Sequence, residues 1–246
     1  MVNSKIEAFK TDTGIDVTAI TTDQMREVDR IAMEETGPNL FQMMENAGRN
    51  LALQAIEVLG SGWKEANIVV LAGLGGNAGG GICAARHLAN RQANVRLALS
   101  NPDRLGEVPA FQHKIFHSTS AKEVEIANLT GKRPDLIIDA VIGYSLKGAP
   151  RGVALELIQW ANETGAPILS LDVPSGVDST TGAAEGEYIQ AKWTMTLALP
   201  KTGLLPDKTG GLFLADIGIP EAVYAKMGLN YTDPFADRYR VPLQVL

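Results

Sequence analysis

The sequence concentrates glycine in one short stretch that could bind a phosphate group. Six glycines fall between Gly73 and Gly81, and the spacing Gly73-x-Gly75-x-x-Ala78 follows an apolar run and precedes a predicted helix. Backbone N–H groups at such a helix start can approach a phosphate closely, and the helix dipole favours its negative charge. The acidic residue that binds ribose in dinucleotide dehydrogenases is missing from 95–101. A dehydrogenase and a glycine loop with only a turn-forming role therefore stay as alternatives.

Two further segments place acidic and hydroxyl side chains at the ends of apolar runs. Asp139 ends one run, and Asp172 begins the turn Asp-Val-Pro-Ser-Gly that contains Ser175. A loop-capping aspartate and a simple turn explain these residues equally well. Together with Asn77, however, Asp139 and Ser175 offer amide, carboxylate and hydroxyl oxygens with one negative charge. Such hard ligands suit a monovalent cation better than zinc, so the sequence predicts a potassium site.

Other reactive residue types give weaker signals. His113 and His117 stand four residues apart, but no third metal ligand is visible from the sequence. We interpret His87 as a packing or surface residue and Cys83 as a small, inert core residue, since no base partner for a thiolate is evident. Ser175 lies outside a G-x-S-x-G motif, which argues against a catalytic triad.

Alternation of apolar runs with helical patterns predicts an α/β fold. Expected strands cover 67–73, 95–100, 135–140 and 167–171, with further runs at 193–199 and 212–216, and expected helices cover 22–36, 40–60 and 152–164. Such alternation implies right-handed crossovers and a parallel sheet. We therefore predict a Rossmann-like three-layer α/β/α sandwich with a mostly parallel central sheet, preceded by two N-terminal helices. A single domain is expected, with its core at 21–220, extensions at 1–20 and 221–246, and an irregular tail from 231.

The composition indicates which classes of partner and which cell compartment to expect. Twenty-two Lys and Arg against 28 Asp and Glu give a formal net charge of −6, which disfavours nucleic acid as a partner. No apolar run approaches the length of a membrane span, and the first residues lack a signal-peptide pattern. The single cysteine cannot form an internal disulfide. We expect a soluble protein of the reducing cytoplasm that contacts neither nucleic acid nor membrane.

Several ordered blocks resemble one known family. These are QMREVDR and MMENAG in the expected first helices, the glycine loop followed by AARHL, DLIIDAVIG, DVPSGVDSTTG, KTGL and DIGIP. Between about residues 21 and 220 the chain is similar to the NAD(P)H-hydrate epimerases, which include the N-terminal half of bifunctional nicotinamide-nucleotide repair enzymes and apolipoprotein-binding relatives. The resemblance supports the same Rossmann-like fold.

The resemblance implies an isomerase that interconverts the two C6 epimers of hydrated NADH or NADPH, so that a stereospecific dehydratase can restore the cofactor. C6 is a hemiaminal carbon, so the reaction needs proton transfer at its oxygen, a role we expect for Asp139 and Asp172. Potassium is expected on Asn77, Asp139 and Ser175. The implied substrate contacts are Asp172, the loop Gly76, Asn77, Ala78, Gly79 and Gly80, and the loop Gly143, Tyr144, Ser145, Leu146, Lys147, Gly148 and Ala149.

Two positions depart from the family pattern. Gly80 stands where the family loop GNNGGDG has an acid, and Tyr144 replaces a small hydroxyl residue. These changes leave two alternatives open: a paralogue that uses the same crevice for another small ligand, and a non-catalytic binding or scaffold protein. The family tendency to pair predicts a homodimer, and the dehydratase is expected to be a separate protein.

Overall fold

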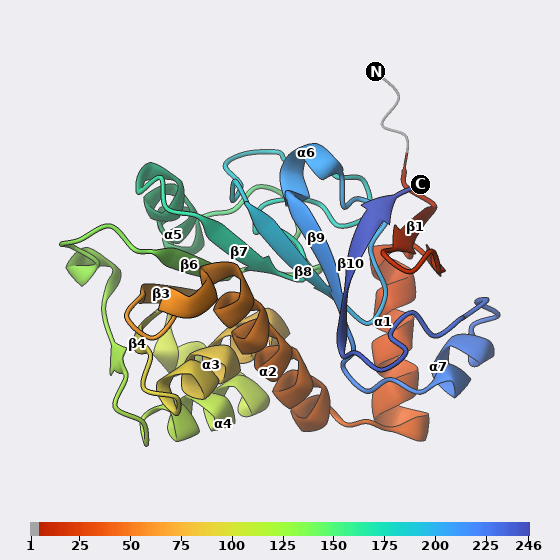
Figure 1. Ribbon diagram of the computed structural model, residues 1–246, viewed down its shortest axis with the longest axis horizontal. Coiled ribbons are helices and arrows are strands. Elements are labelled where there is room, and N and C mark those ends of the chain that lie inside the picture. Colours follow the sequence, from red (N-terminus) through yellow and green to blue (C-terminus); the bar gives the residue numbers. More distant parts are fainter. Residues whose placement is uncertain (1–4) are drawn as a thin grey trace.

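The computed structural model describes residues 5–246, whose strands form one ten-stranded sheet (Figure 1). Its order is β2-β1-β10-β9-β8-β7-β6-β3-β4-β5. Every neighbouring pair from β9 to β5 is parallel, whereas β9–β10, β10–β1 and β1–β2 are antiparallel. The strands are β1 Ala8–Thr11, β2 Asp16–Thr18, β3 Asn67–Ala72, β4 Asn94–Leu99, β5 Lys122–Glu123, β6 Leu136–Ala140, β7 Ile168–Leu171, β8 Trp193–Leu197, β9 Gly211–Ala215 and β10 Arg240–Val245.

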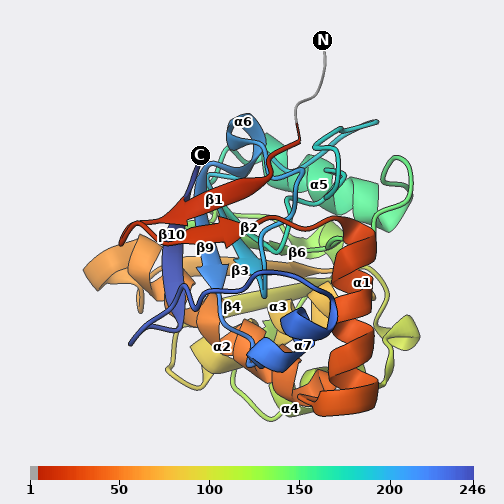
Figure 2. The same cartoon turned by 90° about the vertical axis from the view of Figure 1, so that its right-hand side faces the viewer.

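Helices cover both faces of the parallel part, which confirms the predicted three-layer α/β/α arrangement (Figure 1). Helices α2, α3 and α4 lie on one face and α5 on the other, while α1 and α7 lie beside the antiparallel end (Figure 2). The helices are α1 Thr22–Ile31, α2 Leu40–Leu59, α3 Gly76–Ala89, α4 Glu107–Phe116, α5 Val153–Glu163, α6 Pro206–Thr209 and α7 Glu221–Lys226.

Capping explains where the first two long helices begin. Thr21 with Gln24 and Asn39 with Gln42 each form a reciprocal capping box, which satisfies N–H groups that a helix start leaves without partners. The predicted helix at 22–36 is confirmed as α1 followed by a π-helical turn over Ala32–Thr36. Residues of both segments line the cavity described below.

The central strands are continuously apolar because helices bury both of their faces. In β3, Val70 packs with the core beneath α2, α3 and α4, whereas Val69 and Leu71 pack with the core beneath α5. All three side chains are fully buried. This two-sided burial makes β3 and β6 a rigid support for the loops that follow them.

The ends of the chain differ from expectation. Two short strands, β1 and β2, precede the helices, and the tail at 240–245 is β10, paired with both β9 and β1. The expected irregular tail is therefore wrong from Arg240 onward. Val241 and Leu243 alternate inward along β10, and Pro242 lies beyond the stretch that pairs with β1, where its missing N–H does not interrupt that pairing.

Within residues 5–246, none of the helices combines the length and apolarity that crossing a membrane requires.

Candidate functional site

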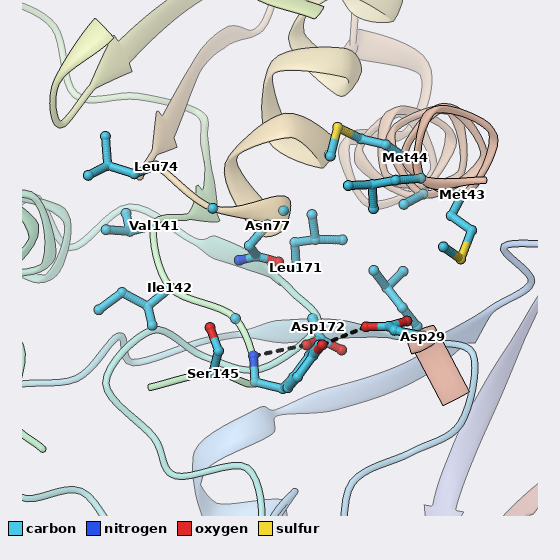
Figure 3. A pocket seen from close by; sticks show the side chains of 18 of the residues that line it. Asp29, Met43, Met44, Leu74, Asn77, Val141, Ile142, Ser145, Leu171 and Asp172 are labelled. Carbon is cyan, nitrogen blue, oxygen red and sulfur yellow. Dashed lines mark hydrogen bonds between the residues drawn. The ribbon is translucent and has the colours of Figure 1, made fainter. Parts of the chain in front are cut away.

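A cavity of about 720 Å³ opens at the carboxyl ends of β3, β6 and β7. The chain leaves β3 toward β4 and β5 and later returns to the other side of β3 with β6. This reversal of direction is where parallel α/β sheets bind ligands. Figure 3 shows side chains that converge there from α1, α2, the start of α3 and the loops after β6 and β7.

Most of the cavity wall is apolar. Residues Met25, Met33, Leu40, Met43, Met44, Leu74, Val141, Ile142 and Leu171 line it. Polar groups are fewer and fall into two sets. One set, Asp29, Asn77, Asp172 and Lys201, is buried or half-buried. The other, Asn101, Arg104, Ser145 and Arg151, includes an exposed serine and two exposed arginines. An apolar cavity with a few placed polar groups is typical of a small-molecule site.

Asp172 forms a buried ion pair with Lys201. Lys201 Nζ lies 2.5 Å from Asp172 Oδ1 and also donates to the Leu197 carbonyl at 2.9 Å. The backbone N–H of Tyr144 donates to the other carboxylate oxygen at 3.2 Å. Asp172 adopts a φ of +68°, a conformation that Asp and Asn tolerate better than most residues. The turn thus directs the carboxylate into the cavity wall while Lys201 balances its charge.

Asp29 supplies a second carboxyl group to the same cavity. The Tyr144 hydroxyl donates to Asp29 Oδ2 at 2.5 Å, and Asp29 and Asp172 lie close together in Figure 3. Burial raises the pKa of Asp29, and the Tyr144 hydrogen bond and the Lys201 charge offset only part of that rise. Burial and the adjacent Asp29 also raise the pKa of Tyr144. Tyr144 therefore connects two carboxyl groups with different surroundings, one beside a cation and one without.

The raised pKa of Asp29 predicts a pH-dependent effect of Asp29→Asn. A carboxyl whose pKa is raised on folding favours the folded state below its ordinary value of 3.8 and loses that contribution as pH rises through the folded-state value. Asparagine does not ionise, so the free energy of unfolding of Asp29→Asn relative to the parent should increase between about pH 4 and about pH 8. Urea unfolding at both pH values measures this difference, with the exposed Asp23→Asn on the same helix as control. A difference that falls with pH would contradict the assignment.

Asp139 lies behind the cavity wall and does not line it. Its fully buried carboxylate accepts hydrogen bonds from Ser170 Oγ at 2.8 Å, from Ser175 Oγ at 2.6 Å and Ser175 N at 3.0 Å, and from Val141 N at 3.2 Å. Burial raises the pKa of Asp139, and these hydrogen bonds oppose the rise. Asp139 therefore ties the ends of β6 and β7 together. The expected direct role of Asp139 in proton transfer is untested, and the mechanism proposed below uses Asp29 in its place because Asp29 lines the cavity.

The expected potassium ligands meet a test of their chemistry. Ser175 Oγ lies 2.6 Å from Asp139 Oδ1 and 3.1 Å from the Ile142 carbonyl oxygen. One hydroxyl proton cannot serve both acceptors, and the N–H of Ile142 donates to Ser175 Oγ at 2.8 Å. The Asn77 Nδ2 is buried without a hydrogen-bond partner anywhere in residues 5–246, and the Asn77 side chain packs against the Gly143 backbone. The converging oxygens of Asp139, Ser175 and Ile142 fit a weakly held cation, which Asn77 would bind through its amide oxygen because Nδ2 is a hydrogen-bond donor.

The predicted substrate loops divide into cavity-lining and other residues. Gly76, Asn77, Gly80, Gly143, Tyr144, Ser145 and Asp172 line the cavity. Ala78, Gly79, Leu146, Lys147, Gly148 and Ala149 are not among the lining residues, nor is Ser175. The first turn of α3 and the residues directly after β6 therefore form the wall, whereas the second half of the 143–149 loop lies outside it.

Glycines in α3 allow close packing. A Cβ on Gly79 would lie 2.0 Å from Met44 Sδ, one on Gly81 would lie 2.4 Å from Ala140 Cβ, and one on Gly80 would lie 2.7 Å from Leu171 Cδ2. These distances are too short for unbonded atoms, so α3 approaches α2, β6 and β7 only because side chains are missing. The Leu171 side chain therefore occupies the space that an acidic side chain at position 80 would need.

We expect Gly80→Asp to destabilise the protein by about 1–3 kcal/mol, because overpacking a close contact costs that much. Combining it with Leu171→Ala should recover part of the loss. Denaturant unfolding of both variants measures the effect, and Gly75→Asp is the control because a Cβ at Gly75 meets nothing within 4 Å. Equal stability of Gly80→Asp and the parent would contradict the packing account.

Cys83 belongs to a partly buried polar cluster between α2 and α3. Arg86 Nη2 lies 2.5 Å from Glu45 Oε2 and 3.4 Å from both Cys83 Sγ and His87 Nε2. Burial raises the pKa of Cys83 to about 12, in agreement with the interpretation of an inert core thiol. Although Glu45, Cys83 and His87 have a spacing that a metal could bridge, the guanidinium already supplies the positive charge there.

Sequence reasoning did not assign Asp29, Lys201, Arg104 or Arg151 to the site. Asp29 and Lys201 both fall within blocks that resemble the family, QMREVDR and KTGL. Their position in these blocks was the one feature of the sequence that could have pointed to them. Their partners lie far away in sequence, which conceals the contact. For the two arginines no comparable signal exists.

Comparison with known proteins identifies the family. Residues 40–203 match the family model described as YjeF-related protein N-terminus. The chain belongs to this family. Among its YjeF-related relatives, the NAD(P)H-hydrate epimerase of Dehalogenimonas lykanthroporepellens is 50% identical over 96% of each chain. The NAD(P)H-hydrate epimerase of Weissella koreensis is 35% identical over 82% of this chain and 91% of the relative.

Larger YjeF-related proteins and a solved structure extend the comparison. The bifunctional NAD(P)H-hydrate repair enzyme Nnr of Moorella thermoacetica is 34% identical, and the match covers 86% of this chain but 42% of that enzyme. The crystal structure of yeast ynu0 superposes with a TM-score of 0.76, covering 94% of this chain and all of the yeast chain at 23% identity. This structural likeness supports the same fold.

Proposed function

We propose that this YjeF-related protein is an isomerase that epimerises hydrated NADH and NADPH at C6, and so acts in nicotinamide-nucleotide repair. The 50% identity to a named NAD(P)H-hydrate epimerase along almost the whole of both chains carries the proposal. The cavity supports it independently, because two carboxyl groups and a lysine meet apolar walls at the switch point of the sheet.

The cavity wall suits the parts of a hydrated nicotinamide nucleotide. The methionine and leucine side chains contributed by α1, α2 and the loop after β3 form an apolar surface for the reduced ring. Arg104 and Arg151 are exposed among the lining residues, where they can pair with phosphate oxygens. A substrate bound in this way places its ring in the interior and its phosphates toward solvent.

Asp172 and Asp29 divide the proton transfers at the C6 oxygen. For either epimer, the first step is loss of the C6 hydroxyl. Burial raises the pKa of Asp29, and Asp29 donates a proton to this hydroxyl as the C6–O bond breaks. Water leaves, and the lone pair of the ring nitrogen forms an iminium bond to C6. C6 is now planar, so water can add to either face, and this water gives a proton to Asp172, which Lys201 and the Tyr144 N–H hold in place. Proton exchange with solvent then restores protonated Asp29 and ionised Asp172. Different surroundings of two carboxyl groups are the usual basis of such a division.

A potassium ion is part of the proposal. Asn77, Asp139 and Ser175 would hold it, with the Ile142 carbonyl oxygen close to Ser175. When bound, the ion would supply a positive charge that offsets the Asp139 carboxylate and fixes the loops around the cavity. Thermal unfolding in KCl should occur at a higher temperature than in equimolar tetramethylammonium chloride, and Asn77→Ala should remove the difference. Equal melting temperatures of the parent in both salts would refute the potassium site.

The experiment for the activity uses both substrate epimers. Hydrated NADPH as an R and S mixture is incubated with an S-specific dehydratase, which rapidly consumes only the S form. This protein should accelerate consumption of the remaining R form. No acceleration at any potassium concentration would refute the epimerase proposal and favour a paralogue with another ligand, for which Tyr144 beside Asp29 is the motivating observation.

We further infer that this protein acts together with a dehydratase, because bifunctional NAD(P)H-hydrate repair enzymes are among its relatives. A homodimer in the cytoplasm stays our prediction for the assembly and the location. Light scattering after size-exclusion chromatography tests the dimer, and a monomer at micromolar concentration would contradict it.

A further inference from the structure

Two imidazoles and a carboxylate converge at the edge of the sheet, apart from the cavity-lining residues. His113 and His117 lie at the C-terminal end of α4, and Glu123 lies in the edge strand β5. His113 Nε2 is 2.6 Å from Glu123 Oε2 and 3.0 Å from His117 Nε2, and His117 Nε2 is 3.2 Å from the same Oε2. The structure thus supplies the third ligand that the sequence did not reveal.

Backbone and local hydrogen bonds hold this arrangement. The His117 N–H donates to the His113 carbonyl at 3.1 Å, which keeps the two rings one helical turn apart. Thr119 Oγ1 donates to the Phe116 carbonyl at 2.7 Å and accepts from Ala121 N at 3.3 Å, which fixes the turn into β5. Glu123 then pairs with Leu97 of β4. The three side chains start from fixed backbone positions, so a ligand need not order the loop.

The chemistry of the cluster suits a zinc-like ion. Neutral imidazole nitrogens and one carboxylate oxygen are a known three-ligand zinc set, and bond lengths are about 2.1 Å. The circle through the three atoms has a radius smaller than this bond length, so an ion slightly out of their plane can reach all three at about 2.1 Å. Histidines at i and i+4 on one helix face are a common part of such sites. Without an ion, one imidazole must donate its Nε2–H to the other, whereas a shared cation binds both nitrogens as acceptors of the same kind.

Solvent can reach the cluster. The side chain of His117 is 55% exposed and that of Glu123 is 26% exposed. An ion bound there keeps a position for water, and it links the short edge strand β5 to α4.

We propose that His113, His117 and Glu123 bind one divalent transition-metal ion of the zinc class, which fastens the sheet edge to helix α4. The site is independent of the proposed epimerase reaction, because none of its ligands lines the cavity.

Isothermal titration of the metal-free full chain with zinc chloride tests the proposal, in potassium-containing buffer at neutral pH. We expect one ion per chain in the parent. His117→Ala and Glu123→Gln should each weaken binding by more than about 100-fold, because loss of a direct ligand exceeds the 10–100-fold typical of outer-shell changes. The control is His87→Gln, which alters the other cluster of potential ligands, Glu45, Cys83 and His87, and should leave zinc affinity unchanged.

Cobalt(II) gives a second, independent readout. Cobalt bound by His113, His117 and Glu123 should show visible ligand-field bands without the thiolate-to-cobalt charge-transfer band that Cys83 would produce. Absence of stoichiometric zinc binding, unchanged binding in His117→Ala, or loss of binding in His87→Gln would each overturn the proposal. None of these outcomes depends on epimerase activity, so failure here leaves the proposed function untouched.

Discussion

Asp172→Asn is expected to reduce epimerase turnover by about 10²–10⁴-fold, the usual contribution of a positioned acid or base. Asparagine fits the left-handed backbone at this position, φ +68°, and can still accept a hydrogen bond from Tyr144 N or Lys201. It cannot take a proton from water. The coupled dehydratase assay with R-hydrated NADPH measures the effect on protein that circular dichroism shows to be folded.

Asp178→Asn is the matched control for this variant. Asp178 lies in the same turn region outside the cavity lining, and a single oxygen, Oδ1, accepts the hydrogen bonds from Thr180 N and Thr181 N. Asparagine retains that oxygen, so activity should stay within about twofold of the parent, as for most substitutions away from a reacting centre. Full activity of Asp172→Asn would remove Asp172 from the mechanism.

Lys201→Met should give the largest loss of stability, about 3–5 kcal/mol in the free energy of unfolding, because it leaves a buried carboxylate without its cation. Lys201 is fully buried, and Asp172 is only 3% exposed. Urea unfolding at neutral pH measures the loss. Lys208→Met, outside this ion pair, is the control.

The double variant Asp172→Asn with Lys201→Met separates charge from packing. With neither charge present, the pair no longer leaves an uncompensated ion, so the double variant should be more stable than the sum of the two single losses predicts. A coupling energy of about 0.5–3 kcal/mol is expected for residues in direct contact. If the loss of unfolding free energy in the double variant equals the sum of the two single losses, the ion pair does not stabilise this turn.

The parallel half of the fold could be predicted from sequence because burial on both faces leaves a simple pattern. Runs such as NIVVLA in β3 are apolar at almost every position, which distinguishes them from their helical neighbours. The outer strands carry no such signal. β1 and β2 contain four and three residues, and β10 includes Pro242, so their pairing depends on distant partners that a local pattern does not specify.

The cavity was partly predictable for a similar reason. Asn77 and Asp172 follow apolar strands, and parallel strands bring their carboxyl ends to one edge. Asp29 comes from a helix, and its contact with Tyr144 joins residues 115 positions apart. Lys201 follows β8, two strands away from β6. Glu123 occupies a two-residue strand. Such contacts arise from tertiary packing, and spacing along the chain does not encode them.

Close packing of α3 has a consequence for how this cavity can change during evolution. Side chains cannot be added at Gly79, Gly80 or Gly81 without displacing Met44, Leu171 or Ala140, so the start of α3 beside the cavity tolerates few single substitutions. The part of the wall contributed by α1, the Ala32–Thr36 turn and α2 includes four methionines, which are flexible and accept exchange of size and shape. Divergence toward a new ligand would therefore begin at these methionines, while the glycines of α3 keep that helix packed against α2 and the sheet.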